Sequence, residues 1–251
     1  MQPAFLLHGY DWSESSLILD LFTRDQGRVV VAAKGAKRPY SQLRAALLPF
    51  QRLNVAYGAR RARDAAGEAA EVQPLKTAER AGGPAMPGGA ALMTGFYLNE
   101  LLMKLLARHD PHPRLFDAYA QTLPALAAGD ELHTGAALRA FELLLLREIG
   151  LLPALDLVTL TQQPLPPAGS YALRPESGLG RAAAGEPGLE AAAWLALQAA
   201  LDGDALAELQ RACLPALGAL RPMLRQLLHY HLGSPQLRTR QLMMDLQNLE
   251  R

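Results

Sequence analysis

The chain contains a single cysteine, Cys213, among its 251 residues. One thiol cannot form an intramolecular disulfide, and it cannot supply the paired cysteines of a CxxC zinc site. Such a chain is expected in a reducing compartment, and the N-terminal sequence MQPAFLLHGYDWSESS has no basic region of the kind that begins a signal peptide. We therefore predict a cytoplasmic protein without a disulfide or a bound metal.

Long apolar runs and catalytic motifs are also missing. The most apolar stretch, ALRAFELLLLREIGLL, is interrupted by two arginines and two glutamates, so no membrane span is predicted. There is no G-x-S-x-G motif, no Walker sequence, and no GxGxxG after a strand. His229 and His231 are two residues apart, a spacing that points them to different faces of a helix. We predict no enzyme activity, no catalytic residue and no cofactor.

Acidic residues are almost absent from one part of the chain. Between Arg24 and Arg63 there are ten lysines and arginines but one acid, Asp25. Residues 81–210 contain 7 basic and 14 acidic residues, and residues 211–251 contain 6 and 2. The formal net charge of +1 hides this uneven distribution. A local excess of positive charge favours a polyanionic partner.

The first eighty residues have the pattern of short strands separated by turns. The expected strands are residues 5–9, 16–22, 28–33 and 53–57, with a weaker fifth at 68–72. Residues 43–48 suit a short helix between the third and fourth strands. This spacing predicts a small β-barrel or sandwich over residues 1–80.

A change of hydrophobic period marks a second domain. Residues 81–89, AGGPAMPGG, contain four glycines and two prolines and are predicted to be a linker. Beyond them, apolar residues recur at helical spacing over 91–107, 114–128, 135–149, 189–201, 215–232 and 239–249. Residues 154–188 are rich in proline and glycine and are predicted to be an irregular insert, with a possible short strand at 171–173. The expected class is therefore α+β, with a mostly helical domain over 90–251.

Much of the positive charge lies in two loops of the predicted β domain. Lysine tracks a phosphate backbone as a flexible point charge, and arginine can bind two phosphate oxygens at once. Each neutralised phosphate releases a counterion, which gives affinity that is sensitive to salt and independent of sequence. An aromatic side chain beside such charges can stack on a base. The predicted nucleic-acid contacts are Lys34, Lys37, Arg38, Arg44, Arg60, Arg61, Arg63 and Tyr40, with Trp12 as a weaker stacking candidate. The alternative is an ordinary solvated surface.

Several separated segments resemble the family of the bacterial recombinational repair protein RecO. They are FLLHGYDWSESSLILDLFTRDQGRVVVAAKGAKRP with LRAALLPFQRL, then GFYLNELLMKLLARHDPHPRLFDAY with ALRAFELLLLREIGL, and finally LLHYHLGSPQLRTRQLM. The resemblance implies an N-terminal OB-fold followed by a helical domain. Many members carry a zinc-binding element of four cysteines, which would fall within residues 154–188. Those cysteines are missing here, so we expect a metal-free, zinc-finger-like insert.

The resemblance also implies a function and partners. Such proteins bind single- and double-stranded DNA, anneal complementary strands, and with RecR help to load RecA onto DNA covered by single-strand-binding protein. The location implied is the cytoplasm, in association with the nucleoid. The acidic C-terminal tail of single-strand-binding protein docks on the helical domain, and the matching positions here are Arg139, Leu115, Phe116 and Phe141. The rival interpretations are an RNA-binding OB module with a helical interaction domain, and a hydrolase whose site carries no familiar motif.

Overall fold

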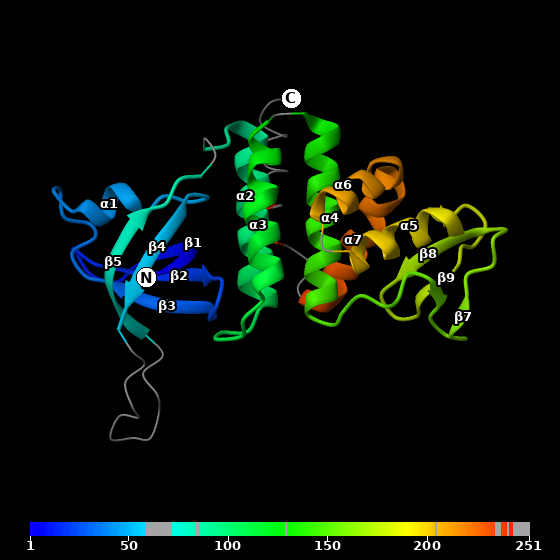
Figure 1. Ribbon diagram of the computed structural model, residues 1–251, viewed down its shortest axis with the longest axis horizontal. Helices are drawn as coiled ribbons and strands as arrows, with labels where there is room; N and C mark the ends of the chain where they lie inside the picture. The colour runs from blue at the N-terminus through cyan, green and yellow to red at the C-terminus, as the bar shows by residue number, and fades with distance from the viewer. Residues whose placement is uncertain are drawn as a thin grey trace, which may run out of the picture. The chain divides into compact units, whose positions relative to one another are not determined.

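The computed structural model describes residues 1–58, 72–83, 86–128, 130–203, 205–233, 237–239 and 241–242. The chain divides into two compact units: Met1–Ala127 together with the C-terminal end of the chain from Leu242, and Ala128–Gln241 (Figure 1). The sequence places a boundary at 81–89, where strands give way to helices, whereas packing divides the chain later, after Ala127. Among the described residues, no helix is both long enough and apolar enough to cross a membrane.

The first unit begins with a closed five-stranded barrel. Its strands are β1 (Gln2–Asp11), β2 (Leu17–Thr23), β3 (Gly27–Ala33), β4 (Arg52–Tyr57) and β5 (Val72–Arg80). They follow one another around the barrel in the order β1-β2-β3-β5-β4, and β4 pairs back onto β1. Among the pairings of these five strands, only that of β3 with β5 is parallel, and the short helix α1 (Gln42–Ala46) lies between β3 and β4 in sequence. This arrangement is an OB-fold, which confirms the predicted fold class.

The fifth strand differs from the sequence-based prediction. The expected segment, 68–72, shares only Val72 with β5, and residues 68–71 lie outside the described residues. β5 has the sequence VQPLKTAER, in which Gln73 and Leu75 are buried and most other side chains are exposed. Such a polar strand carries little signal of its own, because hydrogen bonds from β3 and β4 define it rather than its hydrophobicity.

Two helices of the first unit, α2 (Gly89–Leu105) and α3 (Pro113–Ala127), cover part of the outer surface of the barrel. Phe5 and Phe22 point away from the barrel interior, and both ring centroids lie within 5.4 Å of the Phe116 ring of α3. Asn99 of α2 donates a hydrogen bond to the carbonyl oxygen of Leu7 at 3.0 Å. β1 and β2 are therefore buried on both faces here, which explains their nearly continuous apolar sequences.

A buried ion pair joins the barrel to the end of α2. Arg28 of β3 donates hydrogen bonds from Nε and Nη2 to the carboxylate of Asp20 on β2, at 3.1 and 2.7 Å. Its Nη1 donates to the carbonyl oxygens of Met103 and Leu106, the latter at 2.8 Å. The neighbouring Gly27 has a φ of +65°, and a Cβ atom there would lie 2.0 Å from the carbonyl oxygen of Asp110, which follows α2 in the chain. The start of β3 is therefore shaped to receive the chain that follows α2.

The second unit consists of helices and two small sheets. The helices are α4 (Glu131–Glu148), α5 (Ala191–Asp202), α6 (Leu206–Cys213), the 3-10 turn η1 (Leu214–Ala216) and α7 (Leu217–Leu232). α4 begins four residues before the predicted start, because the Asp130 side chain accepts hydrogen bonds from the backbone N–H groups of Leu132 and His133. The predicted helix at 239–249 lies outside the described residues except for Thr239, Gln241 and Leu242, whose backbone is helical.

The predicted irregular insert is more regular than its composition indicates. It contains the hairpin of β6 (Leu157–Val158) and β7 (Gln163–Pro164), and the strands β8 (Ser170–Arg174) and β9 (Gly178–Arg181). β8 also pairs with β10 (Leu189–Glu190), just beyond the insert, and it includes the strand expected at 171–173. Trp194 of α5 is buried, and its indole N–H donates to the Tyr171 carbonyl at 3.0 Å. This contact ties the sheet to α5.

We expect Asp20→Asn to destabilise the first unit strongly. The change preserves side-chain size but leaves the buried Arg28 guanidinium without its carboxylate, and loss of one partner of a buried pair costs about 3–5 kcal/mol. Urea denaturation followed by circular dichroism measures the loss. Asp117→Asn is the matched control, because it breaks a half-exposed pair with Arg24 and should cost much less. Equal losses in the two variants would contradict the role assigned to Arg28.

Candidate nucleic-acid interface

Two loops of the barrel are hydrogen-bonded to each other and form one surface. The first joins β1 to β2 (residues 12–16), and the second joins β3 to α1 (residues 34–41). The backbone N–H of Gly35 donates to Ser16 Oγ at 3.3 Å, and the N–H of Lys37 donates to the Ser15 carbonyl at 3.0 Å. Within the first loop, the backbone N–H of Trp12 donates a hydrogen bond to the carbonyl oxygen of Ser16 at 3.2 Å. Residues that are 19 and 22 positions apart in the chain are thus held together.

Lys37, a predicted phosphate contact, already has partners. Its ammonium nitrogen lies 3.0 Å from the Asp11 carboxylate, and it donates a hydrogen bond to the carbonyl oxygen of Ser13 at 3.2 Å. The sequence shows no acid within the 34–44 loop, but the fold supplies one from the end of β1. A phosphate at Lys37 must therefore share the ammonium group with Asp11 or displace it.

The other cations of the basic segment fall into two classes. Arg24 and Arg28 are bound to carboxylates, and hydrogen bonding to Asp117 raises the pKa of Arg24. By contrast, Lys34, Arg38 and Arg44 are exposed and form no ion pair with any described residue. The remaining predicted contacts, Arg60, Arg61 and Arg63, lie outside the described residues. Among the described residues of the segment, three of the exposed, unpaired cations therefore lie in the β3–α1 region, and a fourth, Arg52, lies on β4.

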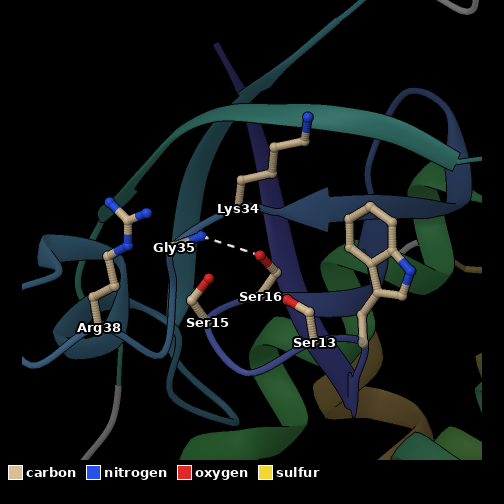
Figure 2. A pocket seen from close by; sticks show the side chains of 7 residues that line it. Ser13, Ser15, Ser16, Lys34, Gly35 and Arg38 are labelled. Atoms are coloured by element: carbon tan, nitrogen blue, oxygen red, sulfur yellow. Dashed lines mark hydrogen bonds between the residues drawn. The ribbon is translucent and has the colours of Figure 1, made fainter.

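A pocket of about 330 Å³ lies between the two loops. It is lined by Trp12, Ser13, Ser15, Ser16, Lys34, Gly35 and Arg38. In Figure 2 the Lys34 and Arg38 side chains extend from either side of Gly35, and the serine side chains of the first loop lie nearby. Gly35 has a φ of +72°, a conformation that favours glycine and lets the chain turn directly after β3. Two cations and several hydroxyl groups around one hollow are suited to an anion.

Exposed aromatic side chains lie close to these loops in the chain. Tyr40 is 99% exposed and Trp12 is 55% exposed, as a stacking role requires. Tyr10 is also exposed, and its ring centroid lies 4.4 Å from that of His8 on the same face of β1. The sequence-based prediction did not include Tyr10 or His8, and it ended the first strand at residue 9, whereas β1 continues to Asp11. The sequence HGYDW places an aromatic or imidazole ring at every second residue, and this alternation could have indicated a strand with these rings on one face.

The four residues assigned to a partner's acidic tail divide between the two units. In the first unit, Leu115 and Phe116 of α3 are fully buried, and Phe116 packs against the barrel strands. In the second unit, Phe141 of α4 is fully buried, and Arg139 Nη1 lies 2.7 Å from the carboxylate of the buried Glu142. Each side chain thus has a packing or pairing role within its own unit, and a shared tail-binding role stays a prediction.

Groups suited to other chemistry are sparse in the described part of the chain. Burial raises the pKa of the Cys213 thiol to about 12, so the reactive thiolate is scarce at neutral pH. Among the described residues, no group of three or more His, Cys, Asp or Glu side chains is arranged to hold a metal ion. The loops of the barrel therefore remain the candidate site with the clearest chemical character.

Comparison with known proteins gives a consistent assignment over almost the whole chain. A family profile described as "Recombination protein O N terminal" matches residues 1–75, and one described as "Recombination protein O C terminal" matches residues 88–241. A protein of Polaromonas sp. strain JS666 is 53% identical, over 99% of this chain and 97% of its own length. One from Verminephrobacter eiseniae is 54% identical, over 99% and 96%. Both relatives are named "DNA repair protein RecO".

Unpaired cations should contribute more than paired ones to the salt dependence of DNA binding, and this difference can be tested directly. Lys34→Ala and Arg38→Ala should each weaken binding to single-stranded DNA and reduce the slope of log affinity against log salt by about 0.7. Fluorescence anisotropy titrations at several NaCl concentrations measure the slope. Lys37→Ala should change it less, because Asp11 already neutralises part of that charge.

Arg24→Ala is the matched control for these variants. It removes the same formal charge from the barrel, but its guanidinium is bound to Asp117, so the slope should stay at the wild-type value. If Arg24→Ala lowered the slope as much as Arg38→Ala, the β3–α1 loop would not be the principal contact surface.

Proposed function

This chain belongs to the recombination protein O family of DNA repair proteins, and we propose that it acts as a DNA-binding mediator of recombination. In this role it binds single- and double-stranded DNA and anneals complementary strands. Together with RecR, it helps to load RecA onto DNA covered by single-strand-binding protein. The observation that supports DNA binding most directly is the set of exposed, unpaired cations Lys34, Arg38 and Arg44 on an OB-fold.

Annealing follows from the physics of such a surface. Two DNA strands repel each other through their phosphates, and a cationic surface that holds both backbones reduces this repulsion. Contacts to phosphate and sugar leave the base edges free to pair. Such a mechanism needs no nucleotide hydrolysis and no metal ion. The buried Cys213 thiol and the paired Glu142 carboxylate take no part in it.

Binding of the acidic tail of single-strand-binding protein is a separate proposal, supported by the family assignment and by the chemistry of Arg139. A guanidinium beside apolar side chains suits a peptide that ends in a carboxylate. Here the Arg139 guanidinium is paired with Glu142 at 2.7 Å, and both side chains are largely buried. A tail carboxylate must therefore share this guanidinium with Glu142 or displace it.

Annealing can be tested without cofactors. The protein should accelerate pairing of two complementary DNA strands in buffer that contains neither nucleotide nor divalent metal, measured by quenching of paired fluorophores. Arg38→Glu should slow annealing, because it reverses charge at the proposed contact surface. Arg221→Glu, an equal reversal at an exposed position of the second unit, should leave the rate unchanged.

The same assay decides between the main alternatives. Failure to anneal naked strands would overturn the mediator role, and a strong preference for matched RNA would favour an RNA-binding module instead. Strands precoated with single-strand-binding protein then test the mediator step, with and without RecR. Acceleration on coated strands is the expected result for the wild type.

The role of Arg139 requires a variant that does not strand a buried charge. Arg139→Ala alone leaves the Glu142 carboxylate without its guanidinium, so the informative variant combines Arg139→Ala with Glu142→Gln. We expect this double variant to lose affinity for a peptide with the acidic tail sequence while its affinity for naked DNA is unchanged. Calorimetry and anisotropy measure the two affinities.

Glu142→Gln by itself is the matched control, because it keeps Arg139 and removes the competing carboxylate; since it leaves the Arg139 guanidinium unpaired, thermal melting must first show that it is folded. It should bind the peptide at least as tightly as the wild type. If the double variant and the control bound the peptide equally well, Arg139 would not be the tail's cation.

A further inference from the structure

We propose that the pocket between the two barrel loops, together with Trp12, forms a subsite for one unpaired nucleotide of a DNA strand. The phosphate lies between Lys34 and Arg38, and the base stacks on the Trp12 indole. The inference rests on the proposed DNA binding and adds to it a structural reason for preferring single strands over duplexes.

The pocket has the chemistry of a phosphate site. The described residues that line it carry two cationic side chains and no carboxylate, and neither cation has an acidic partner among the described residues. Ser16 is buried and its Oγ accepts the Gly35 N–H at 3.3 Å, whereas the Ser13 and Ser15 hydroxyl groups line the same pocket, are less buried and can donate to a ligand. The volume of about 330 Å³ is at the lower end of the range of small-molecule sites, and it suits a phosphate with part of its sugar.

Trp12 supplies the surface for a base. It lines the same pocket as Lys34 and Arg38, yet 55% of its area is exposed. Proteins that bind single strands combine an exposed aromatic ring with a positively charged groove, because every base has a face that can stack on the ring. Trp12 and the cationic pocket beside it are such a combination. Two residues earlier, Tyr10 is exposed on β1 and packs edge-on against His8. The face of β1 that carries Tyr10 offers a second stacking surface for the neighbouring base.

The two halves of this subsite are held in place before a ligand arrives. The Trp12 turn is closed by its hydrogen bond to the Ser16 carbonyl at 3.2 Å. Lys37 fastens the two loops together through Asp11 and the backbone of Ser13 and Ser15. Less ordering is then required on binding, which raises affinity. In this arrangement Lys37 positions the subsite, whereas Lys34 and Arg38 contact the phosphate.

Strand discrimination follows from the same geometry. A duplex offers its phosphates to Lys34 and Arg38, but its bases are stacked on each other and cannot reach the indole. A single strand can engage both halves of the subsite. Loss of the indole should therefore reduce affinity for single strands selectively, and it should leave the electrostatic part of binding intact.

Tryptophan fluorescence tests this inference directly. The chain has two tryptophans, and Trp194 is 0% exposed, so a change caused by DNA at the surface reports on Trp12. Three probes are compared: a short oligodeoxythymidylate, an abasic strand of equal length, and a matched duplex. We expect quenching with oligodeoxythymidylate and little with the other two. Trp12→Phe should abolish the quenching but retain most of the affinity, because phenylalanine still stacks.

Trp12→Ala then measures the contribution of stacking. Its affinity for oligodeoxythymidylate should fall roughly ten-fold, with an unchanged salt slope and unchanged affinity for the abasic strand and the duplex. Tyr230→Ala, which removes an exposed aromatic side chain from the second unit, is the control and should have no effect. Thermal melting confirms that each variant is folded.

Three results would overturn the inference. One is oligodeoxythymidylate binding without quenching, and another is an equal loss of affinity for all three probes in Trp12→Ala. In both cases DNA binding and annealing by the wild type would still support the proposed function. The third, no binding of the wild type to any probe, would overturn the proposed function together with this inference.

Discussion

The first unit depends on one buried cation. The Arg28 guanidinium donates hydrogen bonds to the Asp20 carboxylate on one side and to carbonyl oxygens at the end of α2 on the other. Removal of either member of the Arg28–Asp20 pair would leave the other charge buried and uncompensated. This bond places α2 and α3 beside the start of β3, where Phe5, Phe22 and Phe116 close the packing. The end of β3 is left free to carry the cationic loop. One strand thus serves the core at its beginning and the candidate interface at its end.

Pairing between distant residues also decides how much of the positive charge can reach a ligand. Three cations are paired with carboxylates: Arg24 with Asp117, Arg28 with Asp20, and Lys37 with Asp11. Fewer exposed cations remain among the described residues of the segment, and two of them, Lys34 and Arg38, line one pocket. An OB-fold binds oligonucleotides with the face of its second and third strands and with the loops beside it. The distribution of charge and the topology therefore support the same surface.

Predictability followed the strength of local signals. Four strands and most helices were located from sequence because their apolar residues recur at the period of two or of 3.6. β5 was misplaced, since its polar sequence is held by hydrogen bonds to β3 and β4, which only the closed barrel supplies. Lys34, Arg38 and Tyr40 are exposed, as contact with a ligand requires, and their role in DNA binding stays a prediction. The Asp11 partner of Lys37 was not foreseen, because no local pattern connects residues 11 and 37.

The sequence by itself determined the class of the fold, the excess of positive charge near the N-terminus and, through its resemblance to relatives, the family. These properties follow from residues that are close together in the chain or from segments that match those of relatives, so they can be recognised without coordinates. The tertiary structure decided which cations are neutralised, which aromatic rings remain in solvent, and which loops share hydrogen bonds. Each of these depends on distances between residues far apart in the chain. Such distances are set by closure of the barrel and by the buried contacts of Arg28, rather than by any short stretch of sequence.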